Sequence, residues 1–452
     1  MKKLSRLLYR LLIFAYPLLM TAFYHYYLHG FLAVRNVVSI LLLLYALCLY
    51  MFYFIYMGNK IGVYKVTEIT YSNILALIVT NVFTYLILLI VIQRPFSLLK
   101  FLLMFLIQAV VTCVWVYLAN QVQLKLYGTH RILLIHGKNS NPNLIKQKLH
   151  NRNNRFFVKE IVSEEKGLNH IFSRCEEYGT IMMYGLKPEH KELITKYCFE
   201  KSKQFFLVPE ISDLISFATH PAHIMDTPLY VNNKYVLTMD QLLWKRIFDL
   251  VCGLIGLVIA SPFMLITAIA IKLEDHGPVL YKQKRLTTNG KEFYVYKFRS
   301  MIVDAEKNSG ARLSSGENDS RITKTGKVIR AIRFDELPQI FNIIKGDMSI
   351  VGPRPERPEI AEQYYEQFPE FKYRLKVKAG LTGYAQVYGK YNTTPEDKLK
   401  FDMIYINNYS FYLDLKLIFY TVKILFMKES TEGIDADATT AMISTSDEEP
   451  AI

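Results

Sequence analysis

The chain has 452 residues, which is long enough for two or three domains. Hydrophobic residues make up 51% and aromatic residues 14%, a composition that is rich for a soluble protein and indicates a membrane protein. The formal net charge of +14 suits nucleic acid, anionic lipid or phosphorylated substrates, but no nucleic-acid motif is present. Five cysteines without pairing or ligand spacing argue against a zinc site and a disulfide framework.

Four apolar runs near the start of the chain have the length of a membrane-spanning helix and contain no Asp, Glu, Lys or Arg. They are residues 11–28, 36–57, 72–92 and 101–122. Basic residues lie before the first run and between the second and third, so the positive-inside rule places these ends in the cytoplasm. We therefore expect a four-helix transmembrane region over residues 1–125, after which the chain is cytoplasmic. A signal peptide is the alternative for the first run, but the spans that follow argue against it.

Short apolar strands alternate with polar helical stretches in the next segment. The predicted strands are 131–136, 156–162, 180–184 and 204–208, a pattern typical of a doubly wound, Rossmann-like α/β domain, here placed at residues 126–236. The turn after the first strand has one glycine where a nucleotide-binding turn would have three. A structural or assembly module is therefore favoured over a nucleotide sensor, which stays open.

A further apolar run, residues 250–271, contains Ser261 and Pro262 in its middle. A proline there removes a helix hydrogen bond and kinks the helix. Basic residues flank both ends, and a fifth span would put the following ones outside the cell. The charges therefore favour a re-entrant membrane helix over residues 247–273, with the break at Ser261 and Pro262, rather than a crossing.

Cationic and aromatic residues alternate in the next two segments, 277–285 and 291–301, which we predict to be two short strands. Lys297 and Arg299 belong to the second. Such a surface can grip a nucleotide diphosphate and its base, or it can face lipid headgroups.

Two neighbouring acids, Asp335 and Glu336, precede the apolar run 340–344, which we predict to be a helix that Gly346 ends. Acids at a helix start with a proline in the first turn are ordinary capping residues. We expect the helix start to hold Asp335 ionised.

Three arginines near this pair favour phosphate chemistry: Arg330, Arg333 and Arg354. A carboxylate that faces a diphosphate is repelled unless the charge is neutralised, and a divalent cation would do this. Oxygen ligands without His or Cys point to Mg²⁺, with Mn²⁺ as the alternative.

The end of the chain has two parts. Residues 405–426 are apolar, with Lys416 and Lys423 on one face, which is typical of an interfacial amphipathic helix. Residues 429–452 are acidic and lack aromatics, so we predict a disordered tail.

The region from about Leu242 to Lys428 resembles the bacterial sugar transferase family of polyprenyl-phosphate hexose-1-phosphate transferases. The resemblance rests on motifs that occur in family order. These are Lys245–Asp249, Ser261-Pro262, Gly277–Val279, Lys297–Met301, Asp335–Gln339, Gly346–Ser349, Gly352–Pro355 and Gly380–Gly383. It implies an α+β monotopic phosphoglycosyl transferase domain with a re-entrant helix at residues 241–428, preceded by the membrane α-helical bundle and the Rossmann-like domain of the large polytopic members.

The resemblance also implies an activity. A hexose 1-phosphate passes from a UDP-sugar to undecaprenyl phosphate at the cytoplasmic face of the bacterial inner membrane. UMP is released, and assembly of an exopolysaccharide, capsule or O-antigen type glycan begins. Glucose and galactose are the leading sugars by family habit. Membrane lipids are further partners, nucleic acid is not, and a homo-oligomer and downstream glycosyltransferases are left open. The rival hypothesis is a non-catalytic membrane scaffold or nucleotide sensor for glycan assembly.

Carried over residue by residue, the resemblance makes Asp335 the nucleophile that forms a covalent phosphosugar intermediate. Asp335 and Glu336 would hold the Mg²⁺. Arg354 would bind phosphate, and the substrate contacts assigned with it are Arg330, Arg333, Lys297 and Arg299.

Overall fold

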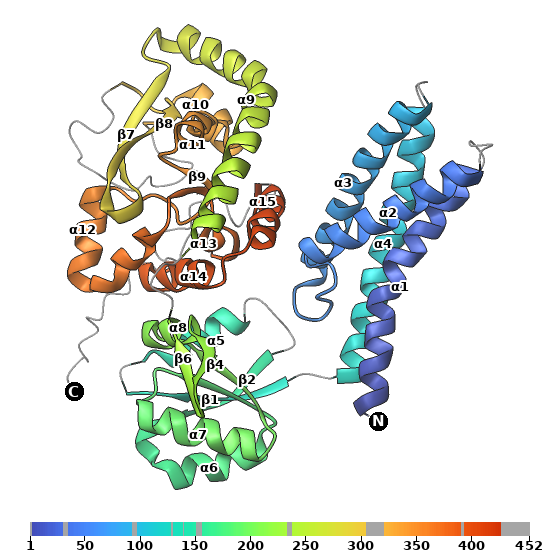
Figure 1. Ribbon diagram of the computed structural model, residues 1–452. Coiled ribbons are helices and arrows are strands. Elements are labelled where there is room, and N and C mark those ends of the chain that lie inside the picture. The colour runs from blue at the N-terminus through green and yellow to red at the C-terminus, as the bar shows by residue number, and fades with distance from the viewer. Residues whose placement is uncertain are drawn as a thin grey trace. The chain divides into compact units, whose positions relative to one another are not determined.

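The computed structural model describes residues 2–29, 35–92, 97–127, 130–138, 140–150, 156–232, 237–303, 321–389 and 393–425. The chain divides into two compact units, Met1–Val208 and Pro209–Ile452 (Figure 1). The predicted acidic tail, 429–452, lies outside the described residues. The domain boundaries predicted from the sequence stay predictions.

The first unit begins with a bundle of four helices. These are α1 (Lys2–His29), α2 (Arg35–Ile55), α3 (Val66–Ile92) and α4 (Leu98–Tyr127). Each helix packs against the next one along the chain, and α1 also packs against α4. The interior is rich in tyrosine, and the rings of Tyr24 and Tyr45 stack with their centres 4.0 Å apart. The predicted N-terminal helical bundle is confirmed.

Four helices in the described part of the chain are long and apolar enough to cross a membrane. The stretches concerned are Val38–Ile55, Val66–Val91, Leu98–Leu126 and Met239–Asp275. The first three overlap the predicted spans 36–57, 72–92 and 101–122, and together the four indicate a membrane protein. The predicted span at 11–28 falls in α1, where some side chains are not described, and it stays a prediction.

An α/β region completes the first unit. Its strands are β1 (His130–His136), β2 (Phe156–Ser163), β3 (Thr180–Tyr184) and β4 (Gln204–Val208), which pair in parallel in the order β2-β1-β3-β4. The remaining elements are α5 (Pro142–His150), η1 (Glu164–Lys166), α6 (Leu168–Glu177) and α7 (Pro188–Glu200). All four strands fall where the apolar runs predict them. A parallel sheet needs such runs because both of its faces are covered.

The second unit carries the motifs described above. It opens with α8 (Ile211–Phe217), β5 (His220–Ile224), β6 (Thr227–Val231), α9 (Met239–Asp275), β7 (Leu280–Leu286), η2 (Thr288–Gly290) and β8 (Glu292–Phe298). It continues with α10 (Lys324–Ala331), η3 (Phe334–Glu336), α11 (Gln339–Lys345), β9 (Ser349–Val351), α12 (Pro358–Gln367) and η4 (Pro369–Lys376). It closes with β10 (Gly380–Thr382), α13 (Tyr384–Tyr388), α14 (Pro395–Asn407) and α15 (Phe411–Leu425). The predicted strand pair is the antiparallel hairpin β7–β8.

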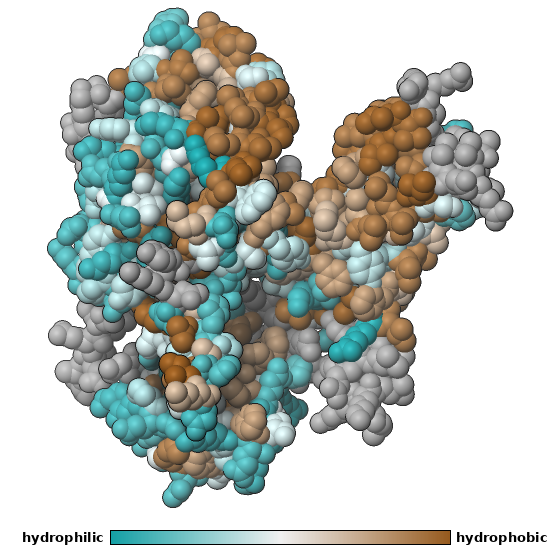
Figure 2. All heavy atoms as spheres, viewed as in Figure 1, coloured by the Kyte–Doolittle hydropathy of each residue, from teal (hydrophilic) through white to brown (hydrophobic). Residues whose placement is uncertain are grey.

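The long helix α9 contains Pro262 and runs through it without ending. Figure 1 shows α9 bent rather than straight, as expected of a helix that loses a backbone hydrogen bond at a proline. One stripe of α9 is buried, whereas large apolar side chains such as Val258, Ile259 and Phe263 are exposed. Figure 2 shows a hydrophobic patch over α9.

The start of α9 is fixed to the rest of the unit by charged side chains. Lys245 Nζ lies 2.6 Å from Asp414 Oδ2 on α15, and both side chains are buried. Arg246 donates to the carbonyls of Ile343 and Ile344, both at 2.7 Å, and so satisfies the end of α11. Asp249 Oδ1 accepts from the backbone N–H of Ile350, in β9, at 3.0 Å. The basic and acidic residues that precede the apolar run are therefore structural anchors.

Close backbone contacts explain two glycines of the motifs. A Cβ on Gly352 would lie 2.2 Å from the carbonyl oxygen of Lys378, and one on Gly380 would lie 2.1 Å from the N atom of Gly352. These glycines let β9 and β10, a short parallel pair, approach each other.

The prediction of one amphipathic helix over residues 405–426 is wrong in one respect. The segment forms parts of two helices, because α14 ends at Asn407 and α15 begins at Phe411, with Ser410 Oγ accepting from Leu413 N at 3.1 Å. Lys423 is buried over the ring of Tyr420 rather than lying on an open face.

Candidate active site

The two acids lie in a short 3₁₀ turn, η3, between α10 and α11. Arg333, just before it, has a left-handed backbone with φ 55°, which turns the chain sharply at this point. The predicted helix after the acids is α11, and Gly346 ends it in the left-handed conformation with φ 98°. The predicted capping role is wrong, because α11 begins after Pro338 and has no side-chain cap.

Glu336 is held by two cations. Its Oε1 lies 2.9 Å from Arg354 Nη2 and 3.2 Å from Lys297 Nζ. Burial alone would raise the pKa of Glu336, but the charges of Arg354 and Lys297 outweigh burial and hold that pKa well below its usual range. Glu336 is therefore ionised, and it orients both cations.

Asp335 differs from its neighbour. It makes no hydrogen bond or ion pair with any of the residues that the structure describes. Burial, and then the charge of Glu336, raise the pKa of Asp335, while Lys297, Arg330 and Arg354 act against this rise. A helix start would lower the pKa of Asp335, but here that pKa is raised, because burial and a like charge dominate. Within the described part of the chain, Asp335 is therefore a carboxylate without a hydrogen-bond or ion-pair partner.

Lys297 reaches the site because β8 is fixed to α11. The buried amide of Asn342 accepts from the N–H of Tyr296 at 3.0 Å and donates to the carbonyl of Tyr294 at 2.7 Å. Asn342 thus extends the hydrogen bonding of the edge strand, and the residue after Tyr296 points its ammonium at Glu336. Burial lowers the pKa of Lys297, while Glu336 acts against this.

The other predicted substrate-binding residues lie at different distances from the acids. Arg333 Nη1 is 3.8 Å from Glu336 Oε2, and Arg330 on α10 is close enough for its charge to lower the pKa of Asp335. Arg299 is turned elsewhere, because its guanidinium pairs with Asp275 and donates to the carbonyl of Pro278 at 2.7 Å. These contacts use the donors that a substrate phosphate would need, and binding of substrate by Arg299 stays a prediction.

Some residues that build the site had no signal in the acid and arginine motifs. Arg285 on β7 donates to the carbonyl of Pro355 at 2.9 Å, and burial and the charge of Arg354 lower its pKa to about 10. Asn342 could have been found, since it is the polar residue inside an otherwise apolar helix. Arg374 lies far along the chain in a basic stretch without a motif.

Comparison with known proteins matches residues 240–428 to the family described as bacterial sugar transferase. A sugar transferase of Bacillus subtilis, described as uncharacterized, is 39% identical over 188 residues, which are 42% of this chain and 90% of that relative. The chain belongs to the bacterial sugar transferase family. The matched region of this sugar transferase includes Asp335 and Glu336 and the two cations beside them, Lys297 and Arg354.

Two further relatives carry specific names. The UDP-N-acetylgalactosamine-undecaprenyl-phosphate N-acetylgalactosaminephosphotransferase of Aeromonas hydrophila is 42% identical over 182 residues, 40% of this chain and 43% of that relative. The UDP-glucose:undecaprenyl-phosphate glucose-1-phosphate transferase of Klebsiella pneumoniae is 40% identical over 195 residues, 42% of each chain. The match to these two relatives thus spans less than half of their length.

Proposed function

We propose that this protein transfers a hexose 1-phosphate from a UDP-sugar to undecaprenyl phosphate and releases UMP. The observation that carries the proposal is the contrast between the two acids. Glu336 is ionised and tied to Arg354 and Lys297, whereas Asp335 beside it has no protein partner among the described residues. The names of the relatives support the choice of donor and acceptor.

In the proposed first step, a carboxylate oxygen of Asp335 attacks the phosphorus that carries the sugar. The bond between that phosphorus and the bridging oxygen breaks, and the oxygen leaves with UMP. The product is a phosphosugar joined to Asp335 through an acyl phosphate. Lys297, Arg330 and Arg354 supply the positive charge that brings two anions together and stabilises the charge on the leaving group.

In the second step, a phosphate oxygen of undecaprenyl phosphate attacks the same phosphorus. The bond to Asp335 breaks, the carboxylate is regenerated, and the sugar is left on a lipid diphosphate. Glu336 stays ionised throughout and keeps Lys297 and Arg354 in place, so both steps use one set of charges.

The two acids suit a Mg²⁺ site in which substrate phosphates supply the remaining ligands. Mg²⁺ in such sites is bound by one or two carboxylates together with phosphates and water. Asp335 offers a carboxylate with no partner in the ranges that the structure describes, and Glu336 Oε2 has Arg333 Nη1 at 3.8 Å. No group of three His, Cys, Asp or Glu that could hold a metal occurs among the residues that the structure describes. When bound by Asp335 and Glu336, the ion would neutralise diphosphate charge.

The second step needs the acids to lie close to the membrane surface. We propose that α9 is a re-entrant helix, which enters the cytoplasmic leaflet and returns at Pro262. Its exposed apolar side chains, its bend and the basic residues at both ends support this topology. The acids would then lie at the cytoplasmic face of a bacterial inner membrane, where a soluble nucleotide sugar meets a lipid phosphate.

We assign the α/β region a Rossmann-like but structural role. The turn after β1 is closed, because Gly137 N donates to the carbonyl of Tyr184 at 3.0 Å. A Cβ on Gly137 would meet the carbonyl oxygen of Gly185 at 1.7 Å. This is the place where a dinucleotide-binding turn leaves room for a pyrophosphate.

The test uses the full chain in detergent with undecaprenyl phosphate and Mg²⁺. UMP release is measured for UDP-glucose, UDP-galactose, UDP-N-acetylglucosamine and UDP-N-acetylgalactosamine. We expect release with one of them and none with Asp335→Asn, while Asp240→Asn, at an exposed acid in the first turn of α9, keeps it. Normal release by Asp335→Asn would contradict the assignment. Glycan assembly in cells that survives Asp335→Asn and Arg354→Met would favour the scaffold instead.

A further inference from the structure

The turn that carries Arg354 is held through its carbonyl groups. Four consecutive carbonyls each accept a hydrogen bond from a different donor. The pairs are Pro353 with Gly380 N at 2.9 Å, Arg354 with Arg374 Nη2 at 2.9 Å, Pro355 with Arg285 Nη1 at 2.9 Å, and Glu356 with Leu286 N at 3.0 Å. Prolines lack an N–H, so carbonyls are the groups by which a Pro-Arg-Pro turn can be fixed.

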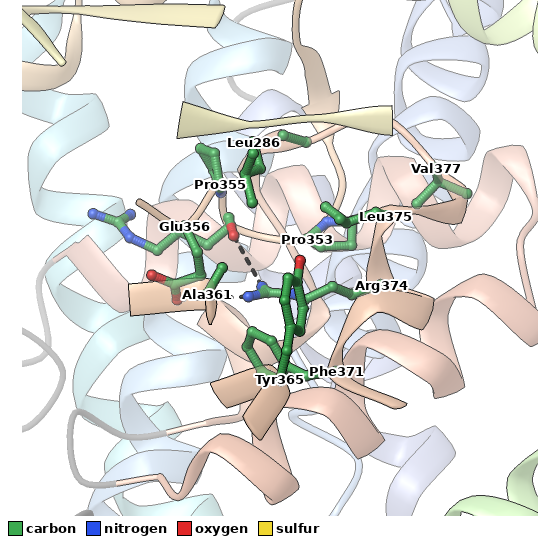
Figure 3. Close-up of a pocket in the computed structure, with 12 residues that line it drawn as sticks. Leu286, Pro353, Pro355, Glu356, Ala361, Tyr365, Phe371, Arg374, Leu375 and Val377 are labelled. Carbon is green, nitrogen blue, oxygen red and sulfur yellow. Dashed lines mark hydrogen bonds and ion pairs between the residues drawn. The ribbon is translucent and has the colours of Figure 1, made fainter. Parts of the chain in front are cut away.

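Arg374, on η4, makes the contact at Arg354 itself. Its guanidinium is 4% exposed and lies 2.8 Å from Asp402 Oδ2 and 3.5 Å from Glu356 Oε1. Its guanidinium carbon lies 4.8 Å from the centre of the Phe371 ring. In Figure 3, Arg374 points toward Glu356 across a small pocket, with Phe371 and Tyr365 below it.

These contacts orient the Arg354 peptide rather than a substrate. The side chain of Arg354 is 42% exposed, and its Nη2 lies 2.9 Å from Glu336 Oε1. A rotation of the peptide plane would swing this long side chain away from the acids. Arg374 opposes that rotation from a buried position, because its donors already face Asp402, Glu356 and the carbonyl.

We propose that Arg374 is a positioning residue, which acts on the transfer reaction by fixing the Arg354 peptide and so the distance from the Arg354 guanidinium to Glu336. This inference rests on the proposed function, since it assumes that Arg354 binds phosphate. A lysine at 374 keeps the positive charge beside Asp402, but it lacks the planar guanidinium that contacts Asp402, Glu356 and the Arg354 carbonyl at once.

The test is a double-mutant cycle on kcat/KM for UMP release. Its members are the wild type, Arg374→Lys, Arg354→Met and the double variant. We expect Arg374→Lys alone to lower kcat/KM about tenfold, as for loss of one hydrogen bond to a charged group. In the Arg354→Met background the same change should cost less than about twofold, because the residue through which Arg374 acts is gone. Equal losses in both backgrounds would overturn the proposal.

Two controls separate positioning from folding. Arg246→Lys removes guanidinium hydrogen bonds to two other carbonyls, those of Ile343 and Ile344, so it should also lower thermal stability. Any loss of kcat/KM that it causes should be the same in the Arg354→Met background, because Arg246 does not act through Arg354. If Arg374→Lys does not fold, Asp402→Asn replaces it in the cycle, because it loosens Arg374 without removing it, and the same two outcomes apply. A wild type that releases no UMP from any UDP-sugar would count against the proposed function, whereas an active wild type with multiplicative losses would count against positioning alone.

Discussion

Replacing Lys297 by methionine tests the electrostatics of the acid pair. Lys297 Nζ lies 3.2 Å from Glu336 Oε1, and the two side chains are 21% and 12% exposed. At an effective dielectric constant of about 20, two unit charges at this distance attract by about 5 kcal/mol. Desolvation offsets part of this, and a hydrogen bond to a charged group contributes about 1.5–3 kcal/mol net. A loss of that size in the transition state lowers kcat/KM roughly ten- to hundredfold.

Lys297→Met should also shift the pH dependence of kcat/KM to higher pH. Lys297 lowers the pKa of Asp335, against burial and the charge of Glu336, so its removal raises that pKa further. The attacking group must be a carboxylate. The acid limb of kcat/KM should therefore move to higher pH in Lys297→Met.

The assay is UMP release between about pH 5 and pH 9. Lys284→Met is the matched control, because Lys284 lies on the same hairpin and pairs with Glu292 at 3.1 Å, but both side chains are about half exposed. An exposed pair contributes about 0–1 kcal/mol, so this variant should keep the wild-type profile. Wild-type kcat/KM and an unmoved acid limb in Lys297→Met would refute the electrostatic account.

Three further predictions concern stability and are measured by unfolding in detergent. Lys245→Met should cost about 3–5 kcal/mol, because it leaves Asp414 buried without its partner, and Lys245→Met with Asp414→Leu should cost less than the single change. Gly352→Ala should cost about 1–3 kcal/mol, since its Cβ would meet the Lys378 carbonyl at 2.2 Å, whereas Gly256→Ala, with its nearest atom at 3.9 Å, should not destabilise. Burial raises the pKa of Asp402 to about 6, against the charge of Arg374. The folded state then binds more protons than the unfolded state between about pH 4 and pH 6, so wild-type stability should fall as pH rises through this window, and Asp402→Asn should remove that slope.

Much of the fold follows from short-range sequence patterns. The four strands of the α/β region and the β7–β8 hairpin lie where apolar and alternating runs predict them, because each such run buries side chains at a fixed period. The end of α11 at Gly346 follows from the same kind of local rule. The break between α14 and α15 is not predicted because apolar residues on both sides read as one run, although Asn407, Asn408 and Ser410 interrupt it.

The candidate site is predicted less completely, since its contacts join distant segments. Asp335, Glu336 and Arg354 are close in sequence and carry a motif. The pairing of Lys245 with Asp414 spans 169 positions, and no local pattern indicates it. The direction of the pKa shift of Asp335 does not follow from the sequence either, because the degree of burial at a turn is set by the packing of α10 and β8 against it.

In the proposed mechanism, Asp335 carries the sugar phosphate between donor and acceptor. The most direct measurement is the intact mass of the purified protein after incubation with the active UDP-sugar and Mg²⁺, without undecaprenyl phosphate. We expect the mass to rise by one sugar phosphate, bound at Asp335. This adduct should be lost when undecaprenyl phosphate is added and should not form in Asp335→Asn. A protein that turns over without any adduct, or an adduct that persists in Asp335→Asn, would contradict it.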